Sequence, residues 1–245
     1  MPTLTMFIDY DNVDPALTRA GPVSLTKLLV PAIPASVFAK YNTLRARLYG
    51  GWRVNGALTV SAQRLVPDIR SNSPTIVSNP NYSPGKPIRL VVELAEGPIG
   101  TSVTLQETLA RDRTLRKFRA RASPWTECHN SAGSCGLAHV ASLTHNTSCS
   151  TPGCTTRIGN VLVRDEQKMV DTLLVADLAH EALVQRVTDV VVVSSDVDMW
   201  PGVLLAAHSG CNVVHVHTKH GWRTQRHLIN TLSTHTAPRY QQLSV

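Results

Sequence analysis

The sequence lacks any long apolar segment. The N-terminus reaches Asp9 before an apolar stretch of useful length, and nowhere is there a run of about 18 apolar residues, as a transmembrane helix requires. We therefore expect no secretory signal and no membrane partner, and we expect the protein in the cytoplasm. Because thiols stay reduced there, the five cysteines are better interpreted as metal ligands or core residues than as disulfides.

Several common enzyme signatures are also missing. The chain has no Gly-x-Ser-x-Gly, Walker or dinucleotide-binding fingerprint, which argues against serine hydrolases, NTPases and dehydrogenases. Acidic residues are scarce relative to basic ones, with 17 Asp and Glu against 24 Lys and Arg and a formal net charge of +7. This surplus favours a polyanionic partner such as nucleic acid, although excess charge also aids solubility.

What is present is a globular composition with regular strand–helix alternation. Hydrophobic residues make up 42% of the 245 residues, which is enough for a sizeable core. The alternation predicts an α/β fold, a three-layer α/β/α sandwich around a mainly parallel sheet. We expect one domain over residues 1–245, with a Cys-rich insertion at 67–158 that holds most of the Ser-Asn-Pro clusters. The predicted strands are 4–8, 43–49, 88–94, 161–163, 190–193 and 213–216, and the predicted helices are 57–66, 166–184, 201–209 and 224–232.

Two acidic clusters follow predicted strands near the two ends of the chain. Asp9-Tyr10-Asp11-Asn12 closes the first strand, and Asp196-Val197-Asp198 follows the strand at 190–193. Carboxylates held together at such an edge are costly without a counter-charge, and this edge of an open α/β sheet is where ligands bind. Asp171, near the start of the helix at 166–184, can add a third contribution. We expect these oxygens to coordinate Mg²⁺ or Mn²⁺.

Each acid also has a structural interpretation. An Asp-x-x-Asn after a strand is often only a turn or a helix cap, and Asp198 could cap the helix that begins near Pro201. Asp171 could be an ordinary acid at a helix start. Asp177 lies on the apolar face of its helix, where a lone carboxylate needs a partner. We expect it to anchor a loop rather than to bind metal.

Three segments carry a family resemblance, and they occur in one order. They are Phe7-Ile8-Asp9-Tyr10-Asp11-Asn12-Val13, then Lys168-Met169-Val170-Asp171 with Val175-Ala176-Asp177-Leu178, then Val193-Ser194-Ser195-Asp196-Val197-Asp198-Met199-Trp200-Pro201-Gly202. Together they resemble the NYN branch of the PIN-like nucleases. Its members have an Asp-x-x-Asn after the first strand, a Lys-x-x-Asp opening a helix with a second Asp six residues on, and a Ser-x-Asp-x-Asp before an aromatic residue and Pro.

The resemblance covers about residues 3–66 and 159–232 and implies a metal-dependent ribonuclease. Ser195 stands where many members have Gly, and Trp200 where Phe is usual, but neither departure removes a carboxylate. Carried over residue by residue, the resemblance implies four metal-binding, catalytic acids supported by an amide and a hydroxyl. These are Asp9, Asp171, Asp196 and Asp198, with Asn12 and Ser194 in support.

Four cysteines in the insertion are candidate ligands of a structural Zn²⁺, within a segment at 125–157. They are Cys128, Cys135, Cys149 and Cys154, at spacings C-x6-C and C-x4-C. Pairs of thiolates on tight turns can supply the four soft, tetrahedral ligands that such a site requires. His129, His139 or His145 could replace one cysteine, and the alternative is a loop with unpaired thiols. We expect the fifth cysteine, Cys211, to be packed in the core.

A basic run at 111–121 contains a single acid, Asp112. Its basic residues are Arg111, Arg113, Arg116, Lys117, Arg119 and Arg121. This density predicts contacts to a nucleic-acid backbone, with Phe118 and Trp125 available to stack bases, although a solvated helix face is the alternative. A second positive patch is formed by Lys219, Arg223, Arg226 and Arg239.

The sequence thus predicts a Mg²⁺/Mn²⁺-dependent ribonuclease that cuts single-stranded RNA internally. Two other hypotheses stay open: an inactive RNA-binding or protein-interaction adaptor of the same fold, and a phosphohydrolase that acts on small phosphate esters. His215 and His217 share one face of a predicted strand and could bind metal, but an ordinary strand edge is the commoner role. Whether the chain forms a homo-oligomer is left open.

Overall fold

The computed structural model describes residues 2–81, 85–112, 152–157, 161–162 and 164–245. The chain divides into two compact units. Unit 1 comprises Met1–Thr108 and Gln167–Val245, and unit 2 comprises Leu109–Glu166. In unit 2, the short strands β7 (Leu109–Asp112) and β8 (Arg164–Gln167) pair. No helix among the described residues is long and apolar enough to cross a bilayer.

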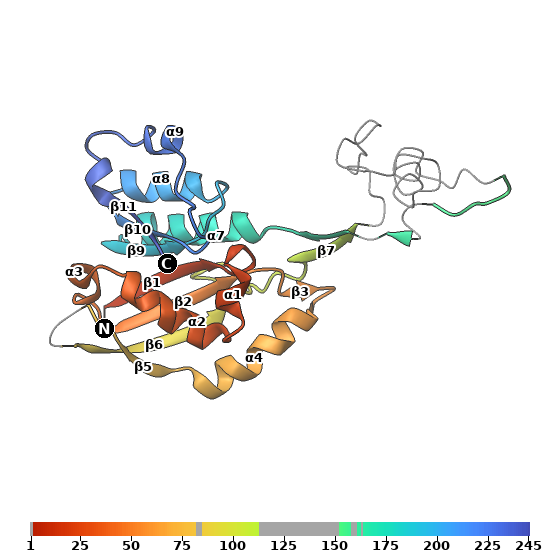
Figure 1. The fold of residues 1–245 in the computed structure, drawn as a ribbon, viewed down its shortest axis with the longest axis horizontal. Helices are drawn as coiled ribbons and strands as arrows, with labels where there is room; N and C mark the ends of the chain where they lie inside the picture. The colour runs from red at the N-terminus through yellow and green to blue at the C-terminus, as the bar shows by residue number, and fades with distance from the viewer. Residues whose placement is uncertain (1, 82–84, 113–151, 158–160, 163) are drawn as a thin grey trace. The chain divides into compact units, whose positions relative to one another are not determined.

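The described part of unit 1 is built on a seven-stranded sheet in the order β11-β10-β9-β1-β2-β6-β5 (Figure 1). The pairs from β11 through to β6 are parallel, and only β5 runs antiparallel to its neighbour β6. The strands are β1 (Thr3–Asp9), β2 (Thr43–Tyr49), β5 (Thr75–Ser78), β6 (Pro87–Leu94), β9 (Asp189–Val193), β10 (Asn212–His217) and β11 (Tyr240–Ser244). A small hairpin of β3 (Arg53–Val54) and β4 (Ala57–Leu58) follows β2.

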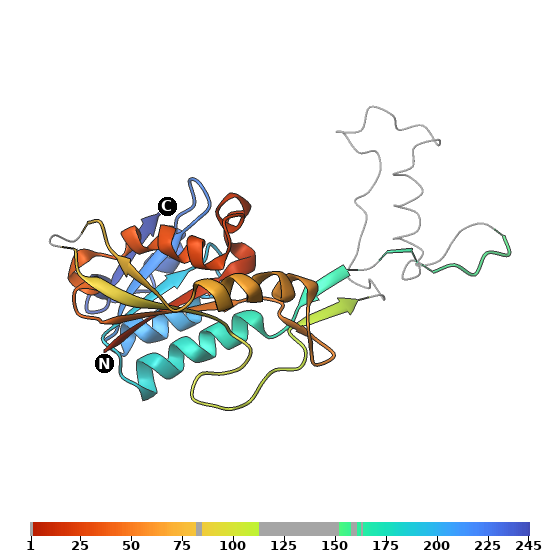
Figure 2. The same cartoon turned by 90° about the horizontal axis from the view of Figure 1, so that it is seen from below.

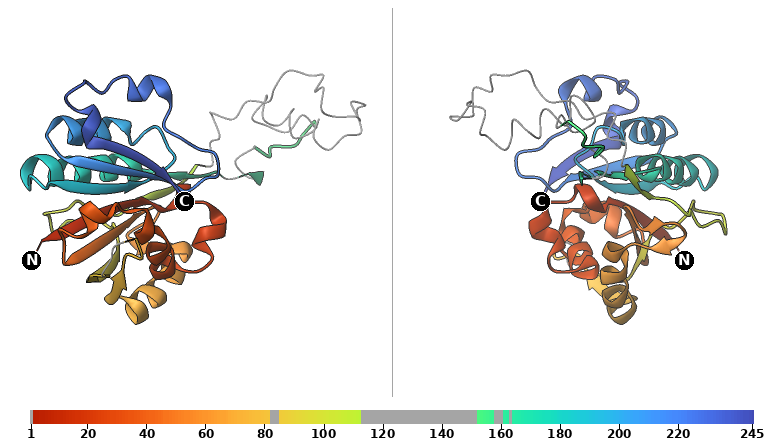
Figure 3. Two further views of the ribbon diagram at one scale, coloured as in Figure 1. Left: turned by 60° about the vertical axis from the view of Figure 1, so that its left-hand side comes forward. Right: turned by 90° about the vertical axis from the view of Figure 1, so that its right-hand side faces the viewer.

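Helices cover both faces of this sheet (Figures 2 and 3). One face carries α1 (Pro15–Thr18), α2 (Pro22–Leu29), α3 (Ala35–Phe38) and α4 (Val60–Asn72). The other carries α7 (Val170–Ala179), which continues as a π-helix over His180–Val184, and α8 (Trp200–His208). The short helix α9 (Arg226–Ile229) lies between β10 and β11 in the chain.

The alternation of side chains along β1 explains the two layers. Met6 and Ile8 point into a core with α2, whereas Phe7 points into a second core with α7 and α8. β9 is buried along its whole length, as its four successive valines require, because parallel strands are covered on both faces. The expected α/β architecture with a mainly parallel sheet between helical layers is therefore confirmed, as are five of the predicted strands.

The helix predicted at 57–66 is wrong at both ends. Residues 57 and 58 form β4, and α4 runs from Val60 through Pro67 to Asn72. The helix begins where the Thr59 side chain accepts a hydrogen bond from the Ala62 amide at 3.2 Å. Pro67 has no backbone N–H and therefore cannot donate a helix hydrogen bond. The packing of Ala62, Leu65 and Ile69 against the core outweighs this loss.

Other boundaries also differ from the prediction. The helix expected at 166–184 starts at residue 170, because 164–167 form β8, and the helix expected at 224–232 spans only Arg226–Ile229. Val161 and Leu162 are not in a strand, contrary to the strand predicted there. Residues 67–108 lie in unit 1 and supply β5 and β6, so the segment outside unit 1 begins at 109 rather than 67. The first of the Ser-Asn-Pro clusters that suggested an earlier start, at residues 71–74, joins the end of α4 to β5.

Candidate active site

The candidate site lies where the order of the strands reverses. From β1 the chain builds the sheet outward through β2 and β6, and then returns to β9 on the other side of β1 before continuing to β10. β1 and β9 are parallel neighbours, with Ile8 paired to Val193. In open α/β sheets, ligands bind at the carboxyl ends of the strands at such a switch point. Asp9 ends β1, and Asp196 follows the end of β9.

Asp9 is a fully buried carboxylate. Its Oδ2 atom accepts hydrogen bonds from Ser194 Oγ at 2.6 Å and from Asn12 Nδ2 at 2.8 Å. Its Oδ1 atom is buried and has no hydrogen-bond partner within the described residues. The pKa of Asp9 is raised to about 6, chiefly because burial disfavours the charged carboxylate. The charges of Asp171 and Asp196 contribute to this rise, and the hydrogen bonds from Ser194 and Asn12 oppose it.

Asp196 is joined to this group through Asn12 and Ser194. The Asn12 amide lies 3.4 Å from Asp196 Oδ2 while it also donates to Asp9, so it bridges the two carboxylates. Ser194 Oγ accepts a hydrogen bond from the backbone N–H of Asp196 at 3.0 Å. Asn12 and Ser194 thus both link β1 to the turn after β9.

Asp171 and Asp198 complete the acidic group. Asp171 lies in the first turn of α7 and is partly buried. Desolvation raises the pKa of Asp171, and the charges of Asp196 and Asp198 raise it as well. Asp198 is exposed, and its N–H donates to Asp196 Oδ1 at 3.1 Å, which shapes the turn. Four acids from three segments distant in sequence therefore interact electrostatically at one edge of the sheet.

The donor chemistry of this group suits a hard cation such as Mg²⁺ or Mn²⁺, and the unpartnered Oδ1 of Asp9 supplies one free ligand atom. Within the described residues, however, no group of three or more His, Cys, Asp and Glu side chains is spaced to hold an ion. Mg²⁺ is commonly bound through only one or two carboxylates with water completing its shell. The residues therefore fit the ion chemically without forming a closed ligand set.

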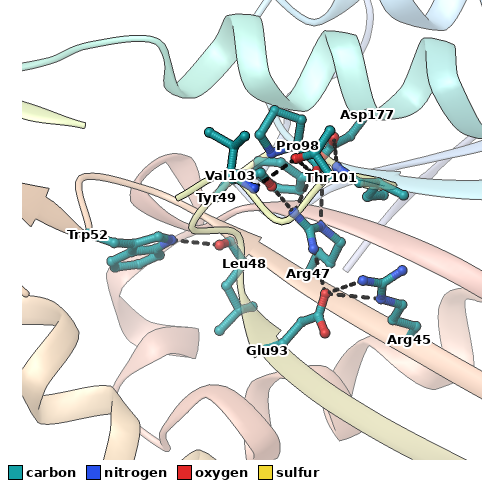
Figure 4. Close-up of polar contacts among 12 residues, drawn as sticks. Arg45, Arg47, Leu48, Tyr49, Trp52, Glu93, Pro98, Thr101, Val103 and Asp177 are labelled. Carbon is teal, nitrogen blue, oxygen red and sulfur yellow. Dashed lines mark hydrogen bonds and ion pairs between the residues drawn. The ribbon is translucent and has the colours of Figure 1, made fainter. Parts of the chain in front are cut away.

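Two further acids have structural roles. Asp11 accepts hydrogen bonds from the Gly51 N–H at 3.1 Å and from the Gln167 side-chain amide, so it ties the turn after β1 to the turn after β2. Asp177 points from α7 toward β2 (Figure 4). It accepts hydrogen bonds from Tyr49 Oη at 2.7 Å, from Arg47 at 3.1 Å and from the N–H of Ile99 at 2.6 Å. It anchors the loop after β6, which confirms the interpretation of Asp177 as a support.

A pair of buried histidines beside the site was not predicted as part of it. The rings of His215 and His217 lie 4.4 Å apart at the end of β10. His215 Nε2 is 2.9 Å from the carbonyl oxygen of Ser194, and its Nδ1 is 2.9 Å from Tyr240 Oη. The pKa of His215 is lowered to about 4, chiefly by burial and in part by the neighbouring His217. His215 is therefore neutral at physiological pH and positions the turn that holds the acids.

The predicted zinc and basic segments fall largely outside the described residues. Cys128, Cys135 and Cys149 lie there, together with Arg113, Arg116, Lys117, Arg119 and Arg121. Cys154 is an exposed thiol, and the backbone of Arg111 lies in β7. Cys211 is buried against α8 and its neighbours, as expected of a core residue.

No family profile, curated protein or solved structure matches this chain significantly.

Proposed function

We propose that this chain is a metal-dependent ribonuclease of the PIN-like, NYN type, which hydrolyses phosphodiester bonds within single-stranded RNA. The observation that supports this most strongly is the Asp9 carboxylate at the switch point. It is fully buried, one of its oxygens has no partner in the described chain, and two further acids raise its pKa. A purely structural carboxylate is expected to be paired or exposed instead.

In this proposal Asp9, Asp171, Asp196 and Asp198 hold Mg²⁺ or Mn²⁺, which when bound lowers the pKa of a water molecule and offsets charge on the phosphate. Asn12 and Ser194 donate to the same oxygen of Asp9, and so leave its other oxygen free for a ligand. The neutral His215 holds the carbonyl of Ser194 and keeps the turn toward Asp196 in place. These contacts preorganise the carboxylates before a substrate arrives.

The choice of RNA as substrate rests on charge and on the family resemblance. The chain carries a formal charge of +7, and its basic run at 111–121 would contact the phosphate backbone. We further propose that Cys128, Cys135, Cys149 and Cys154 bind a structural Zn²⁺ that orders this segment.

The test is cleavage of labelled RNA and DNA oligomers with and without Mn²⁺. We expect Asp196→Asn to reduce RNA cleavage by about 100-fold or more, because it removes a charge that faces the reaction centre. Asp14→Asn is the matched control. Asp14 caps α1 by accepting a hydrogen bond from the Ala16 N–H at 2.8 Å, and asparagine is an equally good cap.

Both variants should unfold at the same temperature as the wild type. Cleavage by Asp196→Asn at the wild-type rate would refute the mechanism.

The second candidate is an RNA-binding adaptor in which the acids have no catalytic role. It is favoured by the finding that the described residues contain no group of three potential ligands spaced to hold an ion. An adaptor should bind RNA equally well in a chelator and degrade none of it. A ribonuclease should instead lose cleavage in the chelator and regain it when Mn²⁺ is added.

A further inference from the structure

The C-terminal part of unit 1 is entirely free of acidic residues. After Asp198 the chain contains no Asp or Glu, but it contains Lys219, Arg223, Arg226 and Arg239. Neither Lys219 nor Arg223 forms an ion pair with a described carboxylate. These two cations flank Trp222 in the loop that follows β10. Unpaired cations on a loop next to an acidic site favour a polyanion as the ligand.

Trp222 is unusually exposed for its residue type. Its relative exposure is 48%, whereas the other described tryptophans, Trp52 and Trp200, are buried. The Lys219 ammonium lies 5.2 Å from the centroid of the Trp222 ring. The backbone N–H of Trp222 donates to the backbone carbonyl of Lys219 at 3.1 Å. The ring is therefore held beside a cation with part of its π surface open, an arrangement that suits a nucleobase.

The loop is anchored directly to the site. Thr224, which ends it, donates its N–H to Gln242 Oε1 at 3.0 Å, and its hydroxyl lies 3.0 Å from His217 Nε2. Asp196, Trp222 and Arg223 are all among the residues that line a cavity of about 50 Å³. The catalytic carboxylate and the exposed indole thus border one hollow.

The cavity is too small for a base but has room for water or a hydroxyl group. Two of its lining residues, Ser195 and His217, are buried, and their Oγ and Nδ1 atoms have no hydrogen-bond partner in the described chain. Such atoms are costly unless a ligand or water satisfies them. A strand lying across this hollow would therefore place its base on the indole and a polar group of its sugar or phosphate over the cavity.

Resting on the proposed function, we infer that the loop of residues 218–225 binds single-stranded RNA beside the acids. Trp222 stacks on a base, and Lys219 and Arg223 contact the adjoining phosphates. This contact positions the neighbouring phosphodiester at Asp196. A protein partner is the less favoured occupant, because the loop and the chain that follows it carry no acid and several unpaired cations.

The test measures binding separately from cleavage. The affinity for a fluorescein-labelled single-stranded RNA is measured in the presence of a chelator. Full-length Asp196→Asn protein is compared with the double variant that carries Asp196→Asn and Trp222→Ala. We expect a loss of about 5- to 100-fold, because stacking contributes about 1–3 kcal/mol per base. Trp222→Phe should retain most of the affinity. Leu183→Ala is the control, since Leu183 is equally exposed (47%) on the π-helix after α7.

Salt dependence provides an independent measurement. The slope of log affinity against log salt is negative, and Lys219→Ala and Arg223→Ala should each make it shallower by about 0.7. Arg64→Ala, an exposed change on α4, should leave the slope as it is. Affinity unchanged by Trp222→Ala would overturn this inference even where Asp196→Asn abolishes cleavage. Conversely, weaker binding by Trp222→Ala together with no cleavage by the wild type would sink the proposed function and leave the binding surface intact.

Discussion

Asp9, an acid of the proposed active site, illustrates how a single residue can oppose stability. Its carboxylate is buried, and only one of its oxygens is hydrogen-bonded within the described chain. A pKa raised to about 6 means that ionising this group is harder in the folded than in the unfolded chain. A bound cation would reverse that preference, and this is the physical reason to keep such a residue here.

Replacing this acid should therefore stabilise the metal-free protein. The unfolded carboxyl has a pKa of 3.8 and the folded one of about 6, so between these values the folded state binds more protons. Stability is lost as the pH rises through this window. In chelator at pH 8, we expect Asp9→Asn to raise the free energy of unfolding by about 1–3 kcal/mol.

Urea unfolding at a series of pH values measures this effect. The advantage of Asp9→Asn should vanish below about pH 4, where both forms are neutral. The control Asp14→Asn should unfold like the wild type at every pH. A destabilised Asp9→Asn at pH 8 would contradict the expected cost of burying the charge.

At the scale of elements, the contacts of Asp177 join a helix, a strand and a loop. Arg47 of β2 pairs with Asp177 of α7 and with Glu93 of β6, and it also donates to the Gly97 carbonyl at 2.6 Å. Arg47 and Asp177 are both buried. The network holds α7 against the sheet, and α7 in turn presents Asp171 to the site.

Asp177→Ala should be strongly destabilising, because it removes the buried carboxylate that pairs with Arg47 and leaves the Tyr49 hydroxyl and the Ile99 N–H without their acceptor. We expect a loss of about 3–5 kcal/mol in the free energy of unfolding. Arg45→Ala is the contrast, since it breaks only the half-exposed pair of Arg45 with Glu93 and should cost at most about 1 kcal/mol.

Denaturant titration measures both variants, and hydrogen exchange should show that the Ile99 amide opens in Asp177→Ala alone. Equal losses in the two variants would count against the network.

The elements that could be predicted from the sequence are those with strong burial. The strand at 190–193 is a run of valines covered on both faces, and the parallel architecture followed from such runs. The edge strands β5 and β11 were missed because they are short and polar, and their pairing depends on a neighbour that the local sequence does not specify. The end of α4 was wrong because tertiary packing outweighs a single proline.

The site could be predicted in the same uneven way. Asp9, Asn12, Ser194 and Asp196 meet because strand ends share one edge, which the alternation of strands and helices implies. Trp222 and the histidines were not placed with them, because β10 and its loop approach the site only through the order of the strands. That order is a property of long-range pairing, and a single sequence does not reveal it.

At the scale of the whole molecule, the two hydrophobic cores found among the described residues lie in unit 1. Every buried member of either core belongs to residues 4–99 or 170–216. The boundary of unit 1 is closed by a hydrogen bond from the Lys168 N–H to the Thr108 carbonyl at 3.0 Å. The two ends of unit 1 therefore meet at a backbone hydrogen bond between residues of unit 1 itself.

Replacing residues 109–166 by a short Gly-containing turn should leave unit 1 folded. We expect retained Mn²⁺-dependent cleavage with weaker RNA binding, because the basic run at 111–121 is removed. Circular dichroism and RNA titration measure these effects.

Elemental analysis tests the zinc proposal. It should find about one zinc per chain in the wild type and none in the deletion. Less than about half a zinc in the wild type would count against the four-cysteine site.

The hydrogen bond between Ser194 and Asp9 also has a consequence for the synthesis of the protein. It joins residues 185 positions apart in the chain, so Asp9 is synthesised well before Ser194. We expect Asp9 to stay a solvated carboxylate during translation until β9 emerges and pairs with β1. If the proposed function is correct, cleavage should begin only after this late pairing step, so its onset would report completion of the fold.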